Sequence, residues 1–85
     1  MNWRLKIAQR AQKSLGKIPA RDQERICAAL ESMGINPFMG DIARLKGEPN
    51  SWRRRVGNYR IFFDVDPVRR VIDIIEITRR TSTTY

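Results

Sequence analysis

Residues 51–65 read SWRRRVGNYRIFFDV, and this stretch decides the fold because its alternation predicts two strands joined at Gly57 and Asn58. After the turn every second side chain is apolar, which is typical of a strand with one buried face. The strand before the turn carries three consecutive arginines instead. A further strand is expected over residues 71–78, where the run VIDIIEI is apolar on both parities and suits a central strand covered on both faces.

The chain before this hairpin predicts one strand and two helices. Apolar and basic side chains alternate over residues 2–7, as in a half-buried strand. A short helix is expected over residues 8–15, and a second helix over residues 19–34, each ending at a glycine. The segment 36–50 is rich in Asn, Pro and Gly, so we expect a loop there.

The predicted order is a strand, a two-helix hairpin and a three-stranded antiparallel meander. This order predicts an α+β fold in which the helices pack on one face of a four-stranded sheet. The 85 residues are expected to form a single domain, 1–85. Cys27 falls within the apolar pattern of the second helix, so we expect it to fill the core rather than act as a nucleophile.

The composition limits the function mainly through charge. Seventeen Lys and Arg against nine Asp and Glu give a net charge of +8, which favours nucleic acid, then an acidic protein, then an anionic membrane surface as partner. The chain has one cysteine and no histidine, so neither a disulfide, a metal nor a cofactor is expected. No run is apolar enough for a signal peptide or a membrane span, which indicates a soluble, cytoplasmic protein without a membrane partner.

Positive charge is concentrated between residues 44 and 60, where Glu48 is the only acidic residue. The basic residues of this segment are Arg44, Lys46, Arg53, Arg54, Arg55 and Arg60. Such a stripe is the expected footprint of phosphate binding, although basic runs can also be solubilising surfaces.

Strand alternation separates these arginines between the two faces of the sheet. Arg53 and Arg55 share one face, whereas Arg54 lies on the side of the helices with its guanidinium reaching the edge. In the next strand Arg60 faces away from the helices and is expected to join Arg53 and Arg55. The alternative for Arg60 is an ion pair with Asp64 on the same face.

An aromatic ring accompanies this charge. Phe62 has the parity of Arg60 and offers a surface on which a base of single-stranded RNA could stack, while the alternative is a small hydrophobic cluster. The candidate RNA-binding residues are Arg44, Lys46, Arg54, Phe62 and Arg80.

The segments LKGEPNSWRRR, VGNYRIFFDVD and EITRR, with a tyrosine after the last, resemble the RelE/ParE superfamily of toxins from toxin-antitoxin systems. The resemblance covers nearly the whole chain. Its RelE-like branch cleaves mRNA in the ribosomal decoding site, and its ParE-like branch poisons DNA gyrase. The basic positions and the tyrosine of the RelE-like branch fall on Arg53, Arg55, Arg60, Arg79 and Tyr85, and this complete set favours the mRNA interferase.

The resemblance implies a metal-independent endoribonuclease, in which a ribose 2′-hydroxyl attacks the adjacent phosphate. Arg60 and Arg79 are the candidates for stabilising charge on phosphorus. The best-known relatives carry lysines at positions 53 and 55, and since arginine does not lose its proton, Tyr85 is left as the candidate base.

The resemblance also implies three partners: the ribosome, mRNA and a cognate antitoxin with an acidic or amphipathic segment. Two alternatives remain open at this point. One is a ParE-like toxin acting on DNA gyrase, and the other is a non-catalytic nucleic-acid-binding module.

Overall fold

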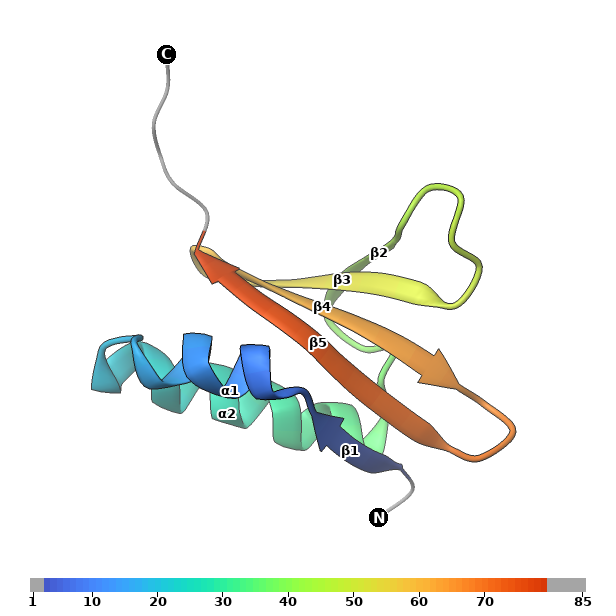
Figure 1. Cartoon of the computed structure of the whole chain (residues 1–85), viewed down its shortest axis with the longest axis horizontal. Coiled ribbons are helices and arrows are strands. Elements are labelled where there is room, and N and C mark those ends of the chain that lie inside the picture. The colour runs from blue at the N-terminus through green and yellow to red at the C-terminus, as the bar shows by residue number, and fades with distance from the viewer. Residues whose placement is uncertain (1–2, 80–85) are drawn as a thin grey trace.

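In the computed structural model of the chain, which describes residues 3–79, two helices cover one face of a five-stranded sheet (Figure 1). The elements are β1 (Arg4–Ile7), α1 (Gln9–Gly16), α2 (Ala20–Ile35), β2 (Asp41–Arg44), β3 (Ser51–Val56), β4 (Tyr59–Asp66) and β5 (Val71–Arg79). The sheet order is β1-β5-β4-β3-β2, in which β1 runs parallel to β5 and all other neighbours are antiparallel. The predicted α+β class, with both helices on one side, is confirmed.

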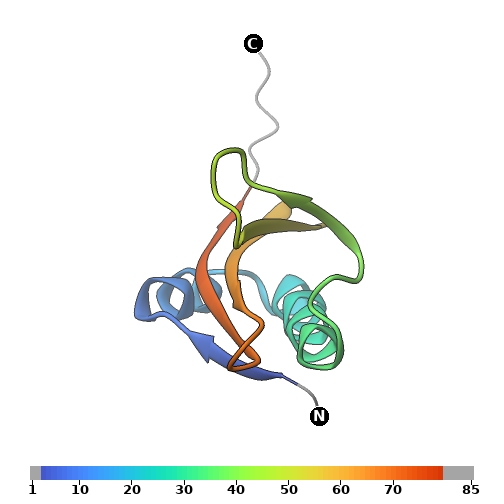
Figure 2. The same ribbon diagram turned by 90° about the vertical axis from the view of Figure 1, so that its right-hand side faces the viewer.

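The core lies between the sheet and the two helices. An end-on view shows both helices on the same side of the sheet (Figure 2). In β4 every second side chain is buried, which confirms the alternation read from the sequence. The buried core residues are Ala11, Ile26, Ala29, Leu30, Met33, Tyr59, Ile61, Phe63, Val65, Ile72, Ile74 and Ile77. The opposite face of the sheet carries no helix and is called the open face below.

Both helices begin and end within two residues of their predicted bounds. In α2, Ile26, Leu30 and Met33 recur at helical spacing and pack against the sheet. The expectation for Cys27 is wrong, because its thiol is exposed. Cys27 follows Ile26 by one residue, which turns it about 100° away from the buried stripe of the helix. Neither helix within residues 3–79 is long and apolar enough to cross a membrane.

The sheet has five strands rather than the four predicted. Part of the expected loop, Asp41–Arg44, pairs antiparallel with β3 and places Asp41 opposite Arg55. Gly40, at φ 90°, turns the chain into this strand, a conformation that glycine adopts without strain. A strand of only four residues shows too little alternation to stand out from the turn residues around it.

A bulge divides β5, the strand expected to be central. It does lie between β1 and β4, but Ile75 has no partner in β4, since Phe63 is opposite Ile74 and Phe62 is opposite Glu76. Ile75 is 37% exposed, so the expectation that both faces of this strand are covered is wrong at this position. The extra residue also exchanges the two faces for the rest of the strand.

Candidate functional site

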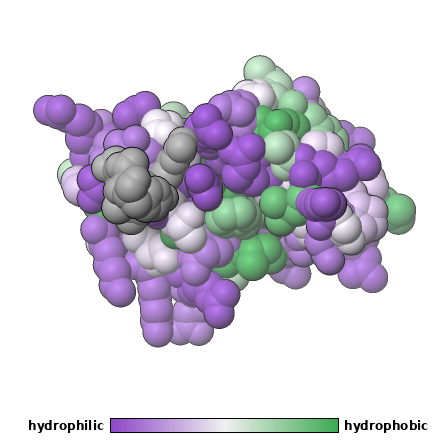
Figure 3. All heavy atoms as spheres, turned by 90° about the horizontal axis from the view of Figure 1, so that it is seen from above, coloured by the Kyte–Doolittle hydropathy of each residue, from purple (hydrophilic) through white to green (hydrophobic). Residues whose placement is uncertain are grey.

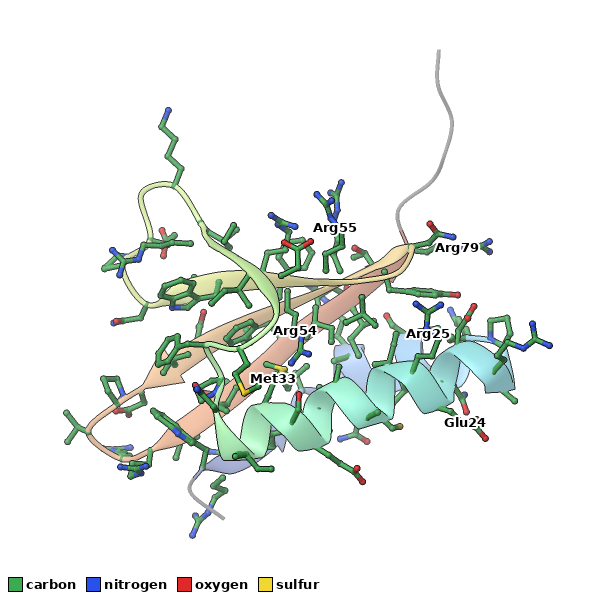
Figure 4. The ribbon with its side chains drawn as sticks, turned by 180° about the vertical axis from the view of Figure 1, so that it is seen from behind. Glu24, Arg25, Met33, Arg54, Arg55 and Arg79 are labelled. Carbon is green, nitrogen blue, oxygen red and sulfur yellow. The ribbon has the colours of Figure 1, made fainter. Side chains whose placement is uncertain are left out.

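Three arginines gather on the open face, and we call Arg53, Arg55 and Arg60 the arginine cluster. The register places Arg55 directly opposite Arg60, and Arg53 opposite Phe62. Side chains directly opposite one another share a face and lie close together. The Arg55 side chain points away from the helices (Figure 4). The predicted convergence of these three side chains is therefore confirmed.

The arginine cluster is only partly neutralised by carboxylates. Arg55 Nε lies 3.8 Å from Asp41 Oδ2, with both side chains about half exposed. The predicted alternative of an Arg60–Asp64 ion pair is wrong, because Arg60 pairs with no carboxylate of residues 3–79 and Asp64 instead accepts a hydrogen bond of 2.5 Å from Ser51. Arg53 Nη1 and Arg60 Nε are buried and have no hydrogen-bond partner among residues 3–79. A buried donor without a hydrogen-bond partner lowers the stability of the folded chain.

Phe62 completes this part of the open face. Phe62 is half-buried between Arg53 on β3 and Glu76 on β5. The Glu76 carboxylate is engaged elsewhere, since it accepts a hydrogen bond of 2.9 Å from Ser14 and lies 3.7 Å from the Nε of Arg10. From above, this face combines hydrophilic side chains with apolar ones (Figure 3). It thus offers cations beside an apolar surface.

Arg54 lies on the helix side of the sheet, away from the arginine cluster (Figure 4). Its Nη1 donates to the main-chain oxygen of Ala29 at 3.2 Å and to the hydroxyl of Ser32 at 2.9 Å, which ties β3 to α2. Its guanidinium also packs against Gly40, where an added Cβ would be 2.9 Å from Nε. Burial lowers the pKa of Arg54. This side chain joins the sheet to the helix, and we leave it out of the candidate RNA-binding set.

Arg79 emerges at the end of β5 and does not share the face of the arginine cluster. It lies opposite Tyr59, whose ring belongs to the core on the helix side. Strict alternation of side chains after Ile74 would place Arg79 on the open face. The bulge at Ile75 shifts the alternation by one residue, so that Arg79 lies on the helix side. Arg79, the second candidate for stabilising charge on phosphorus, therefore does not lie on the same face of the sheet as Arg60.

Tyr59 links this end of the sheet to α2. Its ring is 5% exposed and its hydroxyl donates to Asp22 Oδ2 at 3.0 Å. Burial, then the hydrogen bond and negative charge of Asp22, raise the pKa of Tyr59, and the positive charge of Arg79 acts in the opposite direction. Arg79 is exposed near this pair.

The remaining candidates are dispersed. The Arg44 guanidinium stacks 5.0 Å from the ring centroid of Trp52 at the sheet edge, and Lys46 is exposed in the loop after β2. Arg80 and Tyr85 lie outside the described residues.

Among residues 3–79 no three His, Cys, Asp or Glu side chains come together as a metal site. Sequence reasoning missed Asp41 as the partner of Arg55, because the strand that carries it was not recognised.

Comparison with known proteins identifies relatives of this chain. Residues 5–83 match the family described as the ParE toxin of the type II toxin-antitoxin system parDE. A protein of Methanocaldococcus jannaschii, named as the candidate toxin RelE1, is 31% identical over 83 residues, which are 94% of this chain and 92% of the relative.

Solved RelE structures share the fold. The structure of the archaeal RelE-RelB complex of Pyrococcus horikoshii contains a chain that matches with a TM-score of 0.85 and 25% identity, covering 98% of this chain and all of that one. The isolated RelE toxin of E. coli matches with a TM-score of 0.82 and 19% identity, covering 95% of this chain and 87% of that one. The chain therefore belongs to the ParE toxin family of type II toxin-antitoxin systems, within the RelE/ParE superfamily of toxins.

Proposed function

We propose that the chain is a ribosome-dependent endoribonuclease that inhibits translation by cutting mRNA in the decoding site. The observation that carries this proposal is the arginine cluster, in which cationic side chains from two neighbouring strands meet on the open face. A phosphate of an RNA backbone supplies the negative charge and the acceptor oxygens that this surface lacks.

The reaction that fits this surface is attack of a ribose 2′-hydroxyl on the adjacent phosphate. The bond from oxygen to phosphorus forms as the bond to the 5′-oxygen of the next nucleotide breaks, which leaves a 2′,3′-cyclic phosphate and a 5′-hydroxyl. Arg60 is the candidate for stabilising the charge that develops on the phosphate oxygens, because it lies opposite Arg55 on the open face and is only half-buried. Arg53 and Arg55 would hold the phosphate from the neighbouring strand.

The proton transfers need groups other than these arginines. A guanidinium stays protonated, so it can stabilise charge but cannot accept the 2′ proton. Tyr85, outside the described residues, remains our candidate base, and Arg79 at the end of β5 is proposed to favour the ionised phenol or to contact the RNA. No step that we propose requires a metal. Positioning of the message by the ribosome would supply the orientation that so open a surface does not provide.

We also propose a cognate antitoxin as the partner that restrains this activity. The related chain of Pyrococcus horikoshii was solved as a RelE-RelB complex. A net charge of +8 would steer an acidic segment toward this chain.

The test is primer extension on a defined transcript after brief expression in growing cells. Cuts in phase with codons are expected for the native chain and are expected to be lost in Arg60→Ala, since that change removes the central cation. The matched control is Arg4→Ala, which removes an exposed arginine from β1 at the opposite edge of the sheet. Full toxicity and unchanged cutting in Arg60→Ala would exclude the mechanism.

The second candidate function is a ParE-like action on DNA gyrase, favoured by the matching family, which is named for ParE toxins. Here the arginines would contact protein or DNA. The same cells distinguish the two functions, because a DNA-damage response without transcript cuts would support gyrase as the target.

A further inference from the structure

A carboxylate lies in the same row of side chains as two members of the arginine cluster. In the strand register Asp41 of β2 is opposite Arg55 of β3, and Arg55 is opposite Arg60 of β4. Side chains directly opposite one another on neighbouring strands share a face of the sheet. The Arg55 side chain points away from the helices (Figure 4), so this row belongs to the open face.

Asp41 is accessible and only weakly paired. Its side chain is 58% exposed, and its one ion pair within residues 3–79 is long, with Oδ2 3.8 Å from Arg55 Nε. An exposed pair at this separation contributes little stability. The Asp41 carboxylate can therefore meet a substrate that binds to the arginine cluster.

The other acids of β4 and β5 are less well placed for this. Asp64 and Glu76 each accept a hydrogen bond from a serine side chain. Asp66 accepts main-chain hydrogen bonds in the turn between β4 and β5. Asp73 is opposite Asp64, on the half of the open face away from Arg60. The carboxylate of β2 is thus the one available beside the arginine cluster within residues 3–79.

The proposed reaction requires a proton acceptor that the arginine cluster lacks. Guanidinium groups stay protonated, and the chain has no histidine. Carboxylates have ordinarily lost their proton at neutral pH and can accept one from a hydroxyl in the transition state. Neighbouring strands lie about 4.8 Å apart, so Asp41 and Arg60 are separated by about 10 Å at the main chain. A ribose and its phosphate fit between side chains at that spacing.

We propose that Asp41 is the general base of the cleavage and that Arg55 orients its carboxylate toward a phosphate held at Arg60. The carboxylate takes the proton of the 2′-hydroxyl as the 2′-oxygen forms its bond to phosphorus. The bond from phosphorus to the 5′-oxygen breaks, and this oxygen takes a proton from water. The inference rests on the proposed function, since it assigns the proton acceptor of the same reaction, and it replaces Tyr85 in that role.

The experiment follows cutting of a defined message on purified ribosomes, with the full chain in excess over ribosomes. Asp41→Asn keeps the size of the side chain and removes the proton acceptor, whereas Asp41→Glu retains it. The matched control is Asp73→Asn, the same change on β5 outside the arginine cluster. Affinity is measured separately on ribosomes that carry a 2′-O-methyl message, which lacks the attacking hydroxyl.

A second message separates a base from an acid. It carries sulfur in place of the 5′-oxygen at the position of cutting. A thiolate leaves without first being protonated, so this message removes the need for an acid and keeps the need for a base.

Asp41→Asn is expected to slow cutting of both messages roughly 10²- to 10⁴-fold, the usual contribution of a general base, while the affinity stays within about threefold of native. Asp41→Glu should cut faster than Asp41→Asn, and Asp73→Asn should cut as the native chain does. Native cutting by Asp41→Asn, recovery of its rate on the sulfur-containing message, or an equal loss in Asp73→Asn would overturn the assignment. A defect that disappears at saturating protein would also overturn it, because Asp41 would then act in binding.

Failure of this assignment is distinguishable from failure of the proposed function. If the native chain cuts no message, the proposed function fails and the assignment fails with it. If the native chain cuts and Asp41→Asn cuts at the same rate, only the assignment of Asp41 fails.

Discussion

Arg60→Met is expected to make the free protein more stable and to abolish the proposed cleavage of mRNA. Arg60 lies opposite Arg55, and like charges in that arrangement destabilise a sheet by about 0.2–1 kcal/mol. Its Nε is buried without a partner, a condition that costs about 1–3 kcal/mol in mutational data. Methionine keeps an unbranched apolar stem. It removes both the repulsion from Arg55 and the buried nitrogen.

Because Arg60 is only half-buried, solvent reduces both contributions, and a net gain of about 1 kcal/mol is expected. For a domain of this size that corresponds to a rise in Tm of roughly 4–8 °C. The measurement is thermal unfolding followed by circular dichroism at low and high salt. The gain should be smaller at high salt, since salt screens the repulsion between Arg55 and Arg60.

The matched control is Arg4→Met, an exposed strand arginine that lies opposite Val71 rather than another cation. Its unfolding free energy should change by less than about 0.5 kcal/mol. A lower Tm for Arg60→Met would refute the reasoning, because it would mean that the Arg60 guanidinium is already satisfied within the free protein. Growth inhibition retained by this variant would separately refute its role in cleavage.

Two further predictions concern the helix side of the sheet. Arg54→Ala should lower the unfolding free energy by about 1–3 kcal/mol in urea titration, since it removes two hydrogen bonds from a charged donor to α2, and an unchanged midpoint would contradict that role. Tyr59→Phe should flatten the loss of stability at high pH. The pKa of Tyr59 is raised in the folded chain, so above pH about 10 the unfolded phenol loses its proton first and the native chain is progressively destabilised. An equally steep decline in the variant would show that Tyr59 is not the group responsible.

The sequence predicts the parts of the fold that have strong periodicity. The alternation in β4 and the helical spacing of Ile26, Leu30 and Met33 determine which side chains are buried, and the structure confirms both. The same alternation is sufficient to place Arg53, Arg55 and Arg60 together, because the two strands are joined by a tight turn that fixes their register.

The errors arise where one residue alters the period. At Ile75 the inserted residue moves Arg79 to the other face, and nothing in VIDIIEI marks the bulge because the run is apolar on both parities. The strand Asp41–Arg44 is stabilised by pairing with β3, a contact between distant parts of the chain, so its own four residues carry little signal. The contact between Arg25 of α2 and the turn at Gly57 likewise joins distant parts of the chain.

The parallel pairing of β1 with β5 constrains when the protein can fold. Residues 4–7 of β1 find their strand partner only at residues 71–74, so the first strand must wait for the last one before the sheet is complete. During synthesis the helices can form early, but the position between β1 and β4 stays empty until β5 has left the ribosome. A chain built in this way completes the pairing of its first strand only after β5 has been synthesised.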